Sequence, residues 1–220
     1  PLCDVPCTGI GNQPIDNGQY LFTEEEKNAF LNIEPQAEKL FKVWLGGDEF
    51  INGWRRYCLW LGDLTEEDLE HYPECKKRVE LVRQYRAASN RVSTRRIAAT
   101  PRRFSVENMP APPYIVIPQV SSERRKYIPI GFIVNPNTLC SDKLRLVPNG
   151  TLYHFGILTS SMHMAWMRTL SCRLKSDYSY SNNIVYNTFP WPEASEDQKQ
   201  TISDLADGVL AARDEHPDLS

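Results

Sequence analysis

The spacing of hydrophobic positions changes along the chain, from helical near the N-terminus to alternating in the middle. Thr23, with Glu26 three residues later, has the pattern of a capping box and predicts a helix start. Thr65 begins a second, acidic helix start. Apolar positions then recur at helical spacing between residues 73 and 89: Val79, Val82 and either Tyr85 or Arg86. Residues 1–22, rich in Gly, Pro, Asn and Asp, predict an irregular N-terminal segment.

After Pro101 the pattern predicts mainly extended structure. Residues 112–134 form two β-rich runs joined by a polar turn, and TLYHFGIL, at 151–158, is a third strand candidate. The segments KSDYSY and NIVYNTF also have extended patterns. Between TLYHFGIL and KSDYSY, residues 160–172 predict a short helix. Its expected apolar face consists of Met162, Ala165, Trp166, Thr169 and Leu170.

Helical spacing returns at the C-terminal end of the sequence. Ser195 and Gln198 form another capping-box pattern. The helix that follows has an apolar stripe: Ile202, Leu205, Val209 and Leu210. The order of these elements predicts an α+β fold, with a strand-rich centre and helices at both ends.

Composition excludes few classes of protein. The 220 residues contain no apolar run long enough for a membrane span and no leader pattern, so we expect neither a membrane segment nor a signal peptide. The chain starts at Pro1 without Met, and we interpret it as a piece of a longer protein. Its six cysteines form no CxxC and no His pair has zinc spacing, so we expect reduced thiols in a cytoplasmic protein and no metal site.

Charge is strongly segregated despite a net charge of only −3. From Lys76 to Lys126 there are thirteen basic and three acidic residues. From Lys143 to Lys175 there are five basic residues and no acidic one. This distribution favours a polyanionic partner. The alternative is a solvated helix face, but the basic residues continue through TRRIAATPRRF and SSERRKY, which are not one helix.

Catalytic patterns are weak. The chain has no Gly-rich phosphate loop. The string NPNT, at 135–138, lacks the second proline and the aromatic residue of an amino-methyltransferase loop. Cys172 with His154 or His163 is a candidate thiol pair without an orienting group, and we interpret His163 as a packed or capping residue.

Lys175, Asp177 and Ser179 occupy alternate positions beside tyrosines. If this segment is a strand, their side chains share one face, and Tyr178 and Tyr180 point to the other. Lys can donate to guanine O6 and N7, and Asp can accept from the cytosine amino group. The two side chains can therefore read the two bases of one G·C pair. The alternative is that Lys175 and Asp177 simply pair with each other on the surface.

Several strings together resemble one family. YIPIGF, LYHFGIL with SSMHMAW, RLKSDYSYS and VYNTFPWP look like the target-recognition domain of MmeI-like enzymes. These are single-chain type II restriction–modification proteins that combine an endonuclease, an S-adenosylmethionine-dependent adenine methyltransferase and a recognition domain. The upstream strings EPQAEKLFKVWLGGDEFINGWRRYCLWLGD and IPQVSSERRKYIPIGF also fit, so the resemblance covers nearly the whole chain.

The resemblance implies sequence-specific recognition of double-stranded DNA without catalysis in this chain. The partners would be DNA and the methyltransferase domain of the same parent chain, and S-adenosylmethionine and Mg²⁺ would be bound elsewhere in the parent. Residues 1–192 would form the recognition domain, and 193–220 the start of a C-terminal helical segment. A methyltransferase-only phage-defence protein would share this layout, and a protein-interaction module is the alternative from another class.

The resemblance also implies site residues. Its base-reading positions fall on Lys175, Asp177 and Ser179, with Lys143 as the upstream partner of Ser179 by spacing. Phosphate contacts supply affinity and register without sequence information. We expect them from basic residues of both charged stretches: Arg95, Arg96, Arg102, Arg103, Arg124, Arg125, Lys126 and Arg173.

Overall fold

The computed structural model describes residues 1–216, which divide into two compact units with separate hydrophobic cores. The N-terminal unit comprises Gly11–Met109 and Asn137–Asp142. The C-terminal unit comprises Pro1–Ile10, Pro110–Pro136 and the chain from Lys143 onward. The boundary between residues 192 and 193 stays a prediction, and residues 217–220 of the predicted C-terminal segment lie outside the described residues.

Local capping sets the first helices of the N-terminal unit. The Thr23 hydroxyl accepts from the amide of Glu26 and the Glu26 carboxylate accepts from the amide of Thr23, which confirms the capping box at the start of α1 (Glu24–Ile33). Thr65 and Asp68 make the same exchange at α3 (Glu66–Leu69). The remaining helical segments of this unit are η1 (Pro35–Leu40), α2 (Gly47–Asn52), α4 (Pro73–Ala87), α5 (Val92–Arg96) and η2 (Ile97–Ala99).

Helix α4 resolves an alternative that the sequence left open. Val79 and Val82 are buried, as predicted, and the next buried position is Arg86, whereas Tyr85 is 43% exposed.

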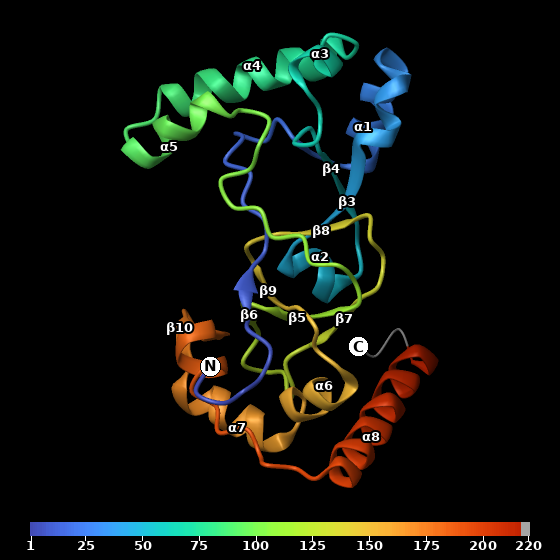
Figure 1. Cartoon of the computed structure of the whole chain (residues 1–220), viewed down its shortest axis with the longest axis vertical. Helices are drawn as coiled ribbons and strands as arrows, with labels where there is room; N and C mark the ends of the chain where they lie inside the picture. The colour runs from blue at the N-terminus through green and yellow to red at the C-terminus, as the bar shows by residue number, and fades with distance from the viewer. Residues whose placement is uncertain (217–220) are drawn as a thin grey trace. The chain divides into compact units, whose positions relative to one another are not determined.

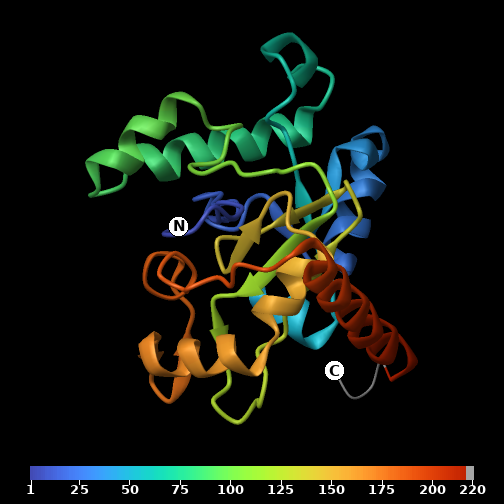
Figure 2. The ribbon, with the colours of Figure 1, turned by 60° about the horizontal axis from the view of Figure 1, so that its bottom comes forward.

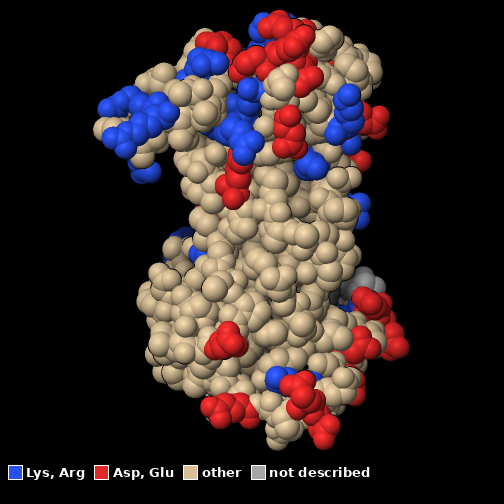
Figure 3. Space-filling model, in the orientation of Figure 1, with Lys and Arg blue, Asp and Glu red and all other residues tan. Residues whose placement is uncertain are grey.

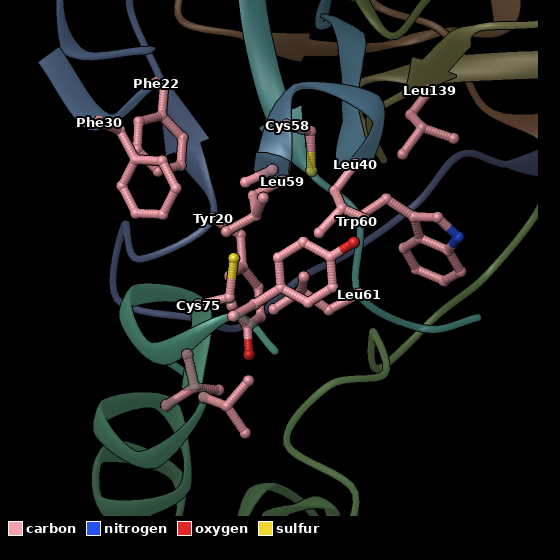
Figure 4. Close-up of a cluster of buried hydrophobic side chains, with 14 of the residues drawn as sticks. Tyr20, Phe22, Phe30, Leu40, Cys58, Leu59, Trp60, Leu61, Cys75 and Leu139 are labelled. Carbon is pink, nitrogen blue, oxygen red and sulfur yellow. The ribbon is translucent and has the colours of Figure 1, made fainter. Parts of the chain in front are cut away.

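The unit's sheet has the order β2-β4-β3-β8, with only the β3–β8 pair parallel. Its strands are β2 (Leu21–Phe22), β3 (Phe41–Leu45), β4 (Arg56–Leu59) and β8 (Thr138–Cys140). Figure 4 shows the aromatic and aliphatic side chains of this core, among them Tyr20 and Trp60.

Two sheets share one polypeptide run in the C-terminal unit. An antiparallel sheet has the order β1-β9-β5-β7, and a second sheet has the order β10-β11-β6. Strand β5 continues through Gln119 directly into β6, so this run contributes to both sheets. The strands are β1 (Gly9–Ile10), β5 (Tyr114–Pro118), β6 (Val120–Ser121), β7 (Gly131–Ile133), β9 (Leu144–Val147), β10 (Cys172–Leu174) and β11 (Asp177–Ser179).

Four helical segments complete this unit: α6 (Leu152–Leu158), α7 (Ser161–Leu170), the π-helical turn η3 (Asn182–Tyr186) and α8 (Glu196–Glu215). The capping box of Ser195 and Gln198 begins α8, as predicted. Helix α8 runs alongside α6 (Figures 1 and 2). Gly156 permits this close approach, because a Cβ there would lie 2.7 Å from the Ile202 side chain.

The α+β class is confirmed, but two predicted strands are wrong. Thr151 is the N-cap of α6 and residues 152–158 form the helix, with His154 completing the capping box; most of 183–189 lies in the η3 turn. Short apolar runs fit a buried helix as well as a buried strand, and periodicity alone does not separate them. Within 151–158 the buried side chains include Phe155 and Leu158, three positions apart, which is a helical spacing.

Two predicted apolar faces are also displaced. The buried positions of α7 are His163, Met164 and Met167, whereas the predicted face around Met162 is largely exposed. In α8, Ile202 and Leu210 of the predicted stripe pack against the core, as predicted, but the buried residue is Ala206, and Leu205 is 68% exposed. Both helices have apolar residues on more than one side, so the choice of buried side came from their packing partners.

Candidate nucleic-acid interface

The predicted reading segment is a hairpin of β10 and β11, with Leu174 opposite Asp177. Lys175 and Ser176 are therefore the turn, and Lys175 has a positive φ of 57°. Two-residue hairpin turns require positive φ in this position because it matches the twist of the strands. The prediction that Lys175 lies on the same strand face as Asp177 is wrong, because Lys175 is at the hairpin tip.

The alternation of β11 itself is confirmed. Tyr178 and Tyr180 are buried, whereas the flanking Asp177 and Ser179 are partly exposed. Ser179 pairs with Val120 and Tyr178 with Ser121, so β11 is held between β10 and β6. One side of this strand thus anchors it in the unit, and the other presents polar side chains to solvent.

Three polar side chains of the hairpin segment, those of Lys175, Asp177 and Ser179, have no internal partners among the described residues. Among the described residues, no hydrogen bond or ion pair engages the side chains of Lys175, Asp177 or Ser179. The alternative that Lys175 and Asp177 pair with each other is not what the structure shows. An unpaired carboxylate and an unpaired ammonium next to each other retain their full capacity to bind an external donor and acceptor.

Backbone hydrogen bonds bring Lys143 close to this strand. The amide of Gln119 donates to the carbonyl oxygen of Lys143 at 2.8 Å, and the amide of Tyr180 donates to the carbonyl oxygen of Gln119 at 2.7 Å. Gln119 therefore lies between exposed Lys143 and the end of β11, because its backbone is hydrogen-bonded to Lys143 on one side and to Tyr180 on the other. The Gln119 side chain is partly exposed and makes no hydrogen bond within the described residues. Sequence reasoning did not identify this residue, which no local motif marks.

A cationic loop lies beside the hairpin. Residues 122–127 form the first part of the connection between β6 and β7, and the side chains of Arg124 and Arg125 make no bond within the described part of the chain. Arg173 of β10 is 3.8 Å from the Glu123 carboxylate and lies over the Tyr178 ring at 4.0 Å. The Arg173 guanidinium also donates to the carbonyl of Ser176. Arg173 thus joins the loop to the hairpin.

The basic residues of the N-terminal unit are mostly engaged. Arg102 pairs with Glu66 at 2.9 Å, and Arg103 pairs with Glu107 at 2.5 Å. Arg95 donates to the carbonyl of Ser89, whereas exposed Arg96 has no partner among the described residues. Figure 3 shows Lys and Arg side chains gathered over the end of the unit where α5 lies.

Arg86 is a buried cation that sequence reasoning left as an alternative to Tyr85. Its guanidinium is fully buried and donates five hydrogen bonds of 2.7–3.0 Å to backbone carbonyls. The acceptors come from residues 14–15 and from 97–103, so Arg86 fixes the segment that contains Arg102 and Arg103. Burial lowers the pKa of Arg86, and nearby Tyr20 and Asp16 oppose that shift.

His163 is packed, as predicted. It is fully buried in α7, and burial lowers its pKa to about 4, so the imidazole is neutral near pH 7.

Among the described residues, no three His, Cys, Asp or Glu side chains gather where they could hold a metal ion. No helix in the same part of the chain is long and apolar enough to cross a membrane.

An anchored strand with unpaired donors and acceptors, beside a cationic loop, offers the kinds of group that protein–DNA contacts use for base edges and phosphates, which is the class of a DNA-recognition domain. The MmeI target recognition domain family matches residues 1–193. The chain belongs to this family. The family and the target-recognition function predicted from the sequence are thereby confirmed.

Two relatives match nearly the whole length of this chain. DNA methyltransferase A of Bacillus subtilis (strain 168) is 38% identical over 98% of this chain. The solved structure of the Type IIL restriction-modification enzyme MmeI in complex with DNA is 41% identical and superposes with a TM-score of 0.95 over 99% of this chain. The chain spans 24% of the first relative and 29% of the second.

Proposed function

We propose that this chain selects the double-stranded DNA sequence on which a larger parent protein acts. The parent would be an S-adenosylmethionine-dependent adenine methyltransferase with an endonuclease, or a methyltransferase-only defence protein. The relatives support this proposal, since one is a DNA methyltransferase and the other a restriction-modification enzyme, each much longer than this chain. S-adenosylmethionine and Mg²⁺ would be bound by other parts of the parent, which would act on DNA in the cytoplasm.

The base-reading residues in this proposal are Lys175, Asp177, Ser179 and Lys143. The observation that carries the assignment is the absence of internal partners for the first three within the described residues. A side chain already bonded inside the protein would have to break that bond before reading a base, which reduces discrimination. Lys175 at the turn and Asp177 at the start of β11 would read guanine and cytosine of one pair.

Of the eight predicted phosphate-contacting residues, those without internal carboxylate or carbonyl partners among the described residues would contact phosphates first. These are Arg96, Arg124, Arg125 and Lys126, of which Lys126 lies near the Tyr127 ring. Arg95, Arg102, Arg103 and Arg173 would have to exchange internal bonds for phosphate oxygens. Their contribution to affinity is therefore expected to be smaller.

The test exchanges the charges of the proposed pair in the full-length parent, as Lys175→Glu with Asp177→Arg. The exchange places the acceptor where the donor was and the donor where the acceptor was. We therefore expect methylation at a different set of genomic sites, in which the G·C pair read by these two residues is replaced by C·G. The measurement is a genome-wide map of methylated adenines. Unchanged sites would contradict the base-reading role.

A matched control exchanges another charged pair of the same unit, Glu196→Lys with Lys199→Glu. These two residues form an exposed ion pair in the first turn of α8, with the Lys199 ammonium 2.8 Å from the Glu196 carboxylate. The control introduces the same number of charge reversals outside the hairpin. We expect its methylation sites to match those of the unaltered protein.

A further inference from the structure

A buried polar contact lies directly behind the reading strand. The Nε2 atom of His163, in α7, is 3.0 Å from the hydroxyl oxygen of Tyr180, the residue that follows β11. Both side chains are buried, with exposures of 0% for His163 and 2% for Tyr180. The Phe189 ring packs edge-to-face on His163 at 4.6 Å. The contact is therefore enclosed by apolar and aromatic groups.

Stability alone does not account for this pair. The Nδ1 atom of His163 is buried without a hydrogen-bond partner in the described part of the chain. A neutral imidazole has one donor and one acceptor nitrogen, so in either tautomer the Nδ1 atom is left without a hydrogen bond. Replacing both residues by apolar side chains of similar shape would remove this cost. A buried polar group without a partner destabilises the fold, whereas an apolar pair in its place leaves no polar group unpaired.

The hairpin has few contacts of its own that fix its position. Strands β10 and β11 have three residues each, and all three of β10 are exposed. A hairpin of this length is marginal in water without further packing. A shift of one residue would turn Tyr178 outward and Asp177 inward, since side chains alternate. Tyr180 opposes this shift from two directions, through its amide to Gln119 and its hydroxyl to His163.

We propose that the His163–Tyr180 hydrogen bond fixes the register and depth of β11, so that Asp177 and Ser179 are presented at a constant position to DNA base edges. His163 and Tyr180 act as positioning residues and do not touch the DNA. The contact ties the reading strand to α7, the helix that also leads into β10 through Ser171. This inference rests on the proposed base-reading function of the hairpin.

The test uses Tyr180→Phe in the full-length parent, with Tyr186→Phe as the matched control. Tyr186 is also fully buried in the C-terminal unit, but its hydroxyl donates to the carbonyl of Pro6 at 2.7 Å. Each variant loses one buried hydroxyl. Hydrogen exchange of residues 172–181 reports the order of the hairpin, and competition between cognate DNA and single-base variants reports selectivity. Both are measured at a temperature where both variants are folded.

We expect faster exchange in residues 172–181 for Tyr180→Phe, together with a loss of selectivity of about tenfold, which corresponds to part of one base contact. Tyr186→Phe should leave both measurements close to those of the unaltered protein. Equal effects of the two variants, or unchanged exchange in Tyr180→Phe, would overturn the positioning role. Faster exchange with unchanged selectivity would support positioning and overturn base reading by β11.

The double variant His163→Leu with Tyr180→Phe separates positioning from stability. Its thermal midpoint is expected to return toward that of the unaltered protein, because no buried polar group is left unpaired at this site. The selectivity loss should persist, because α7 no longer fixes the strand. Recovery of selectivity together with stability would show a merely structural contact and overturn the proposal.

Discussion

Arg86, Arg102 and Arg103 of the N-terminal unit bond to the chain itself, whereas Lys175, Asp177 and Ser179 of the β10–β11 hairpin in the C-terminal unit have no such bonds among the described residues. Arg86 donates to five carbonyls, and Arg102 and Arg103 pair with carboxylates. Lys175 and Asp177 have no partner among the described residues. Both regions stand out in the sequence as charged, but these three arginines are already bonded, whereas Lys175 and Asp177 remain available for a ligand.

The difference shows that charge density along a sequence does not measure binding capacity. A guanidinium has five donors in a planar fork and can close a loop around itself, so an arginine-rich stretch can be a structural device. The N-terminal unit uses Arg86 in this way. We therefore expect substitutions there to affect mainly stability, and substitutions around the hairpin to affect mainly DNA selection.

The largest effect is expected for Arg86→Met, which retains an unbranched apolar stem and removes the guanidinium. Five backbone carbonyl oxygens would lose their buried donor, and the free energy of unfolding should fall by about 3–5 kcal/mol. Urea unfolding followed by tryptophan fluorescence measures the change. Arg83→Met, on the same helix in an exposed ion pair with Glu80, is the control and should cost less than about 0.5 kcal/mol.

The second effect concerns pH and the packed His163. Its folded pKa of about 4 lies below the ordinary value of 6.5, so the unfolded chain binds more protons between these values. Stability is fully present above pH 6.5 and falls as the pH decreases toward 4, by roughly 3 kcal/mol in total. His163→Gln should lack this component when unfolding is measured across the range. Identical pH profiles would contradict burial as the cause.

The third effect separates the two sets of cations by salt dependence. Neutralising Arg124 and Arg125 as Gln should weaken binding to all DNA sequences and lower the salt slope by about two, since each phosphate contact contributes about one. Arg102→Gln with Arg103→Gln should instead change the slope little and destabilise the fold by less than about 1 kcal/mol per ion pair, because both pairs are partly exposed. Equal slopes for the two double variants would remove the contrast between the regions.

The smallest effect is expected on stability at the hairpin tip. Lys175→Ala and Asp177→Ala remove side chains without internal bonds in the described residues, so the free energy of unfolding should change by less than about 0.5 kcal/mol. Thermal unfolding measures this. A larger loss would show that these side chains support the fold and would weaken their assignment as readers.

Local hydrogen bonds could be predicted well from sequence. The predicted boxes at Thr23 and Ser195 involve donors and acceptors three residues apart, so the neighbouring residues alone determine them. At Thr65 the sequence predicted the helix start, and the structure added the box with Asp68. The burial of Tyr178 and Tyr180 followed from alternation in the same way. The family resemblance also lies in the sequence, because its strings extend over nearly the whole chain.

The turn at Lys175, the helix at 151–158 and the burial of Arg86 could not be predicted in this way. Two of these depend on partners distant in sequence: α8 against Gly156, and the carbonyls of residues 14–15 and 97–103 around one guanidinium. The turn at Lys175 is local, set by the pairing of Leu174 with Asp177, but the alternating pattern of the segment favoured one continuous strand. Sequence by itself determined the α+β class, the helix starts, the alternation of β11 and the family. Tertiary structure alone decided which charged side chains were free, because internal pairing depends on contacts that only the folded chain brings together.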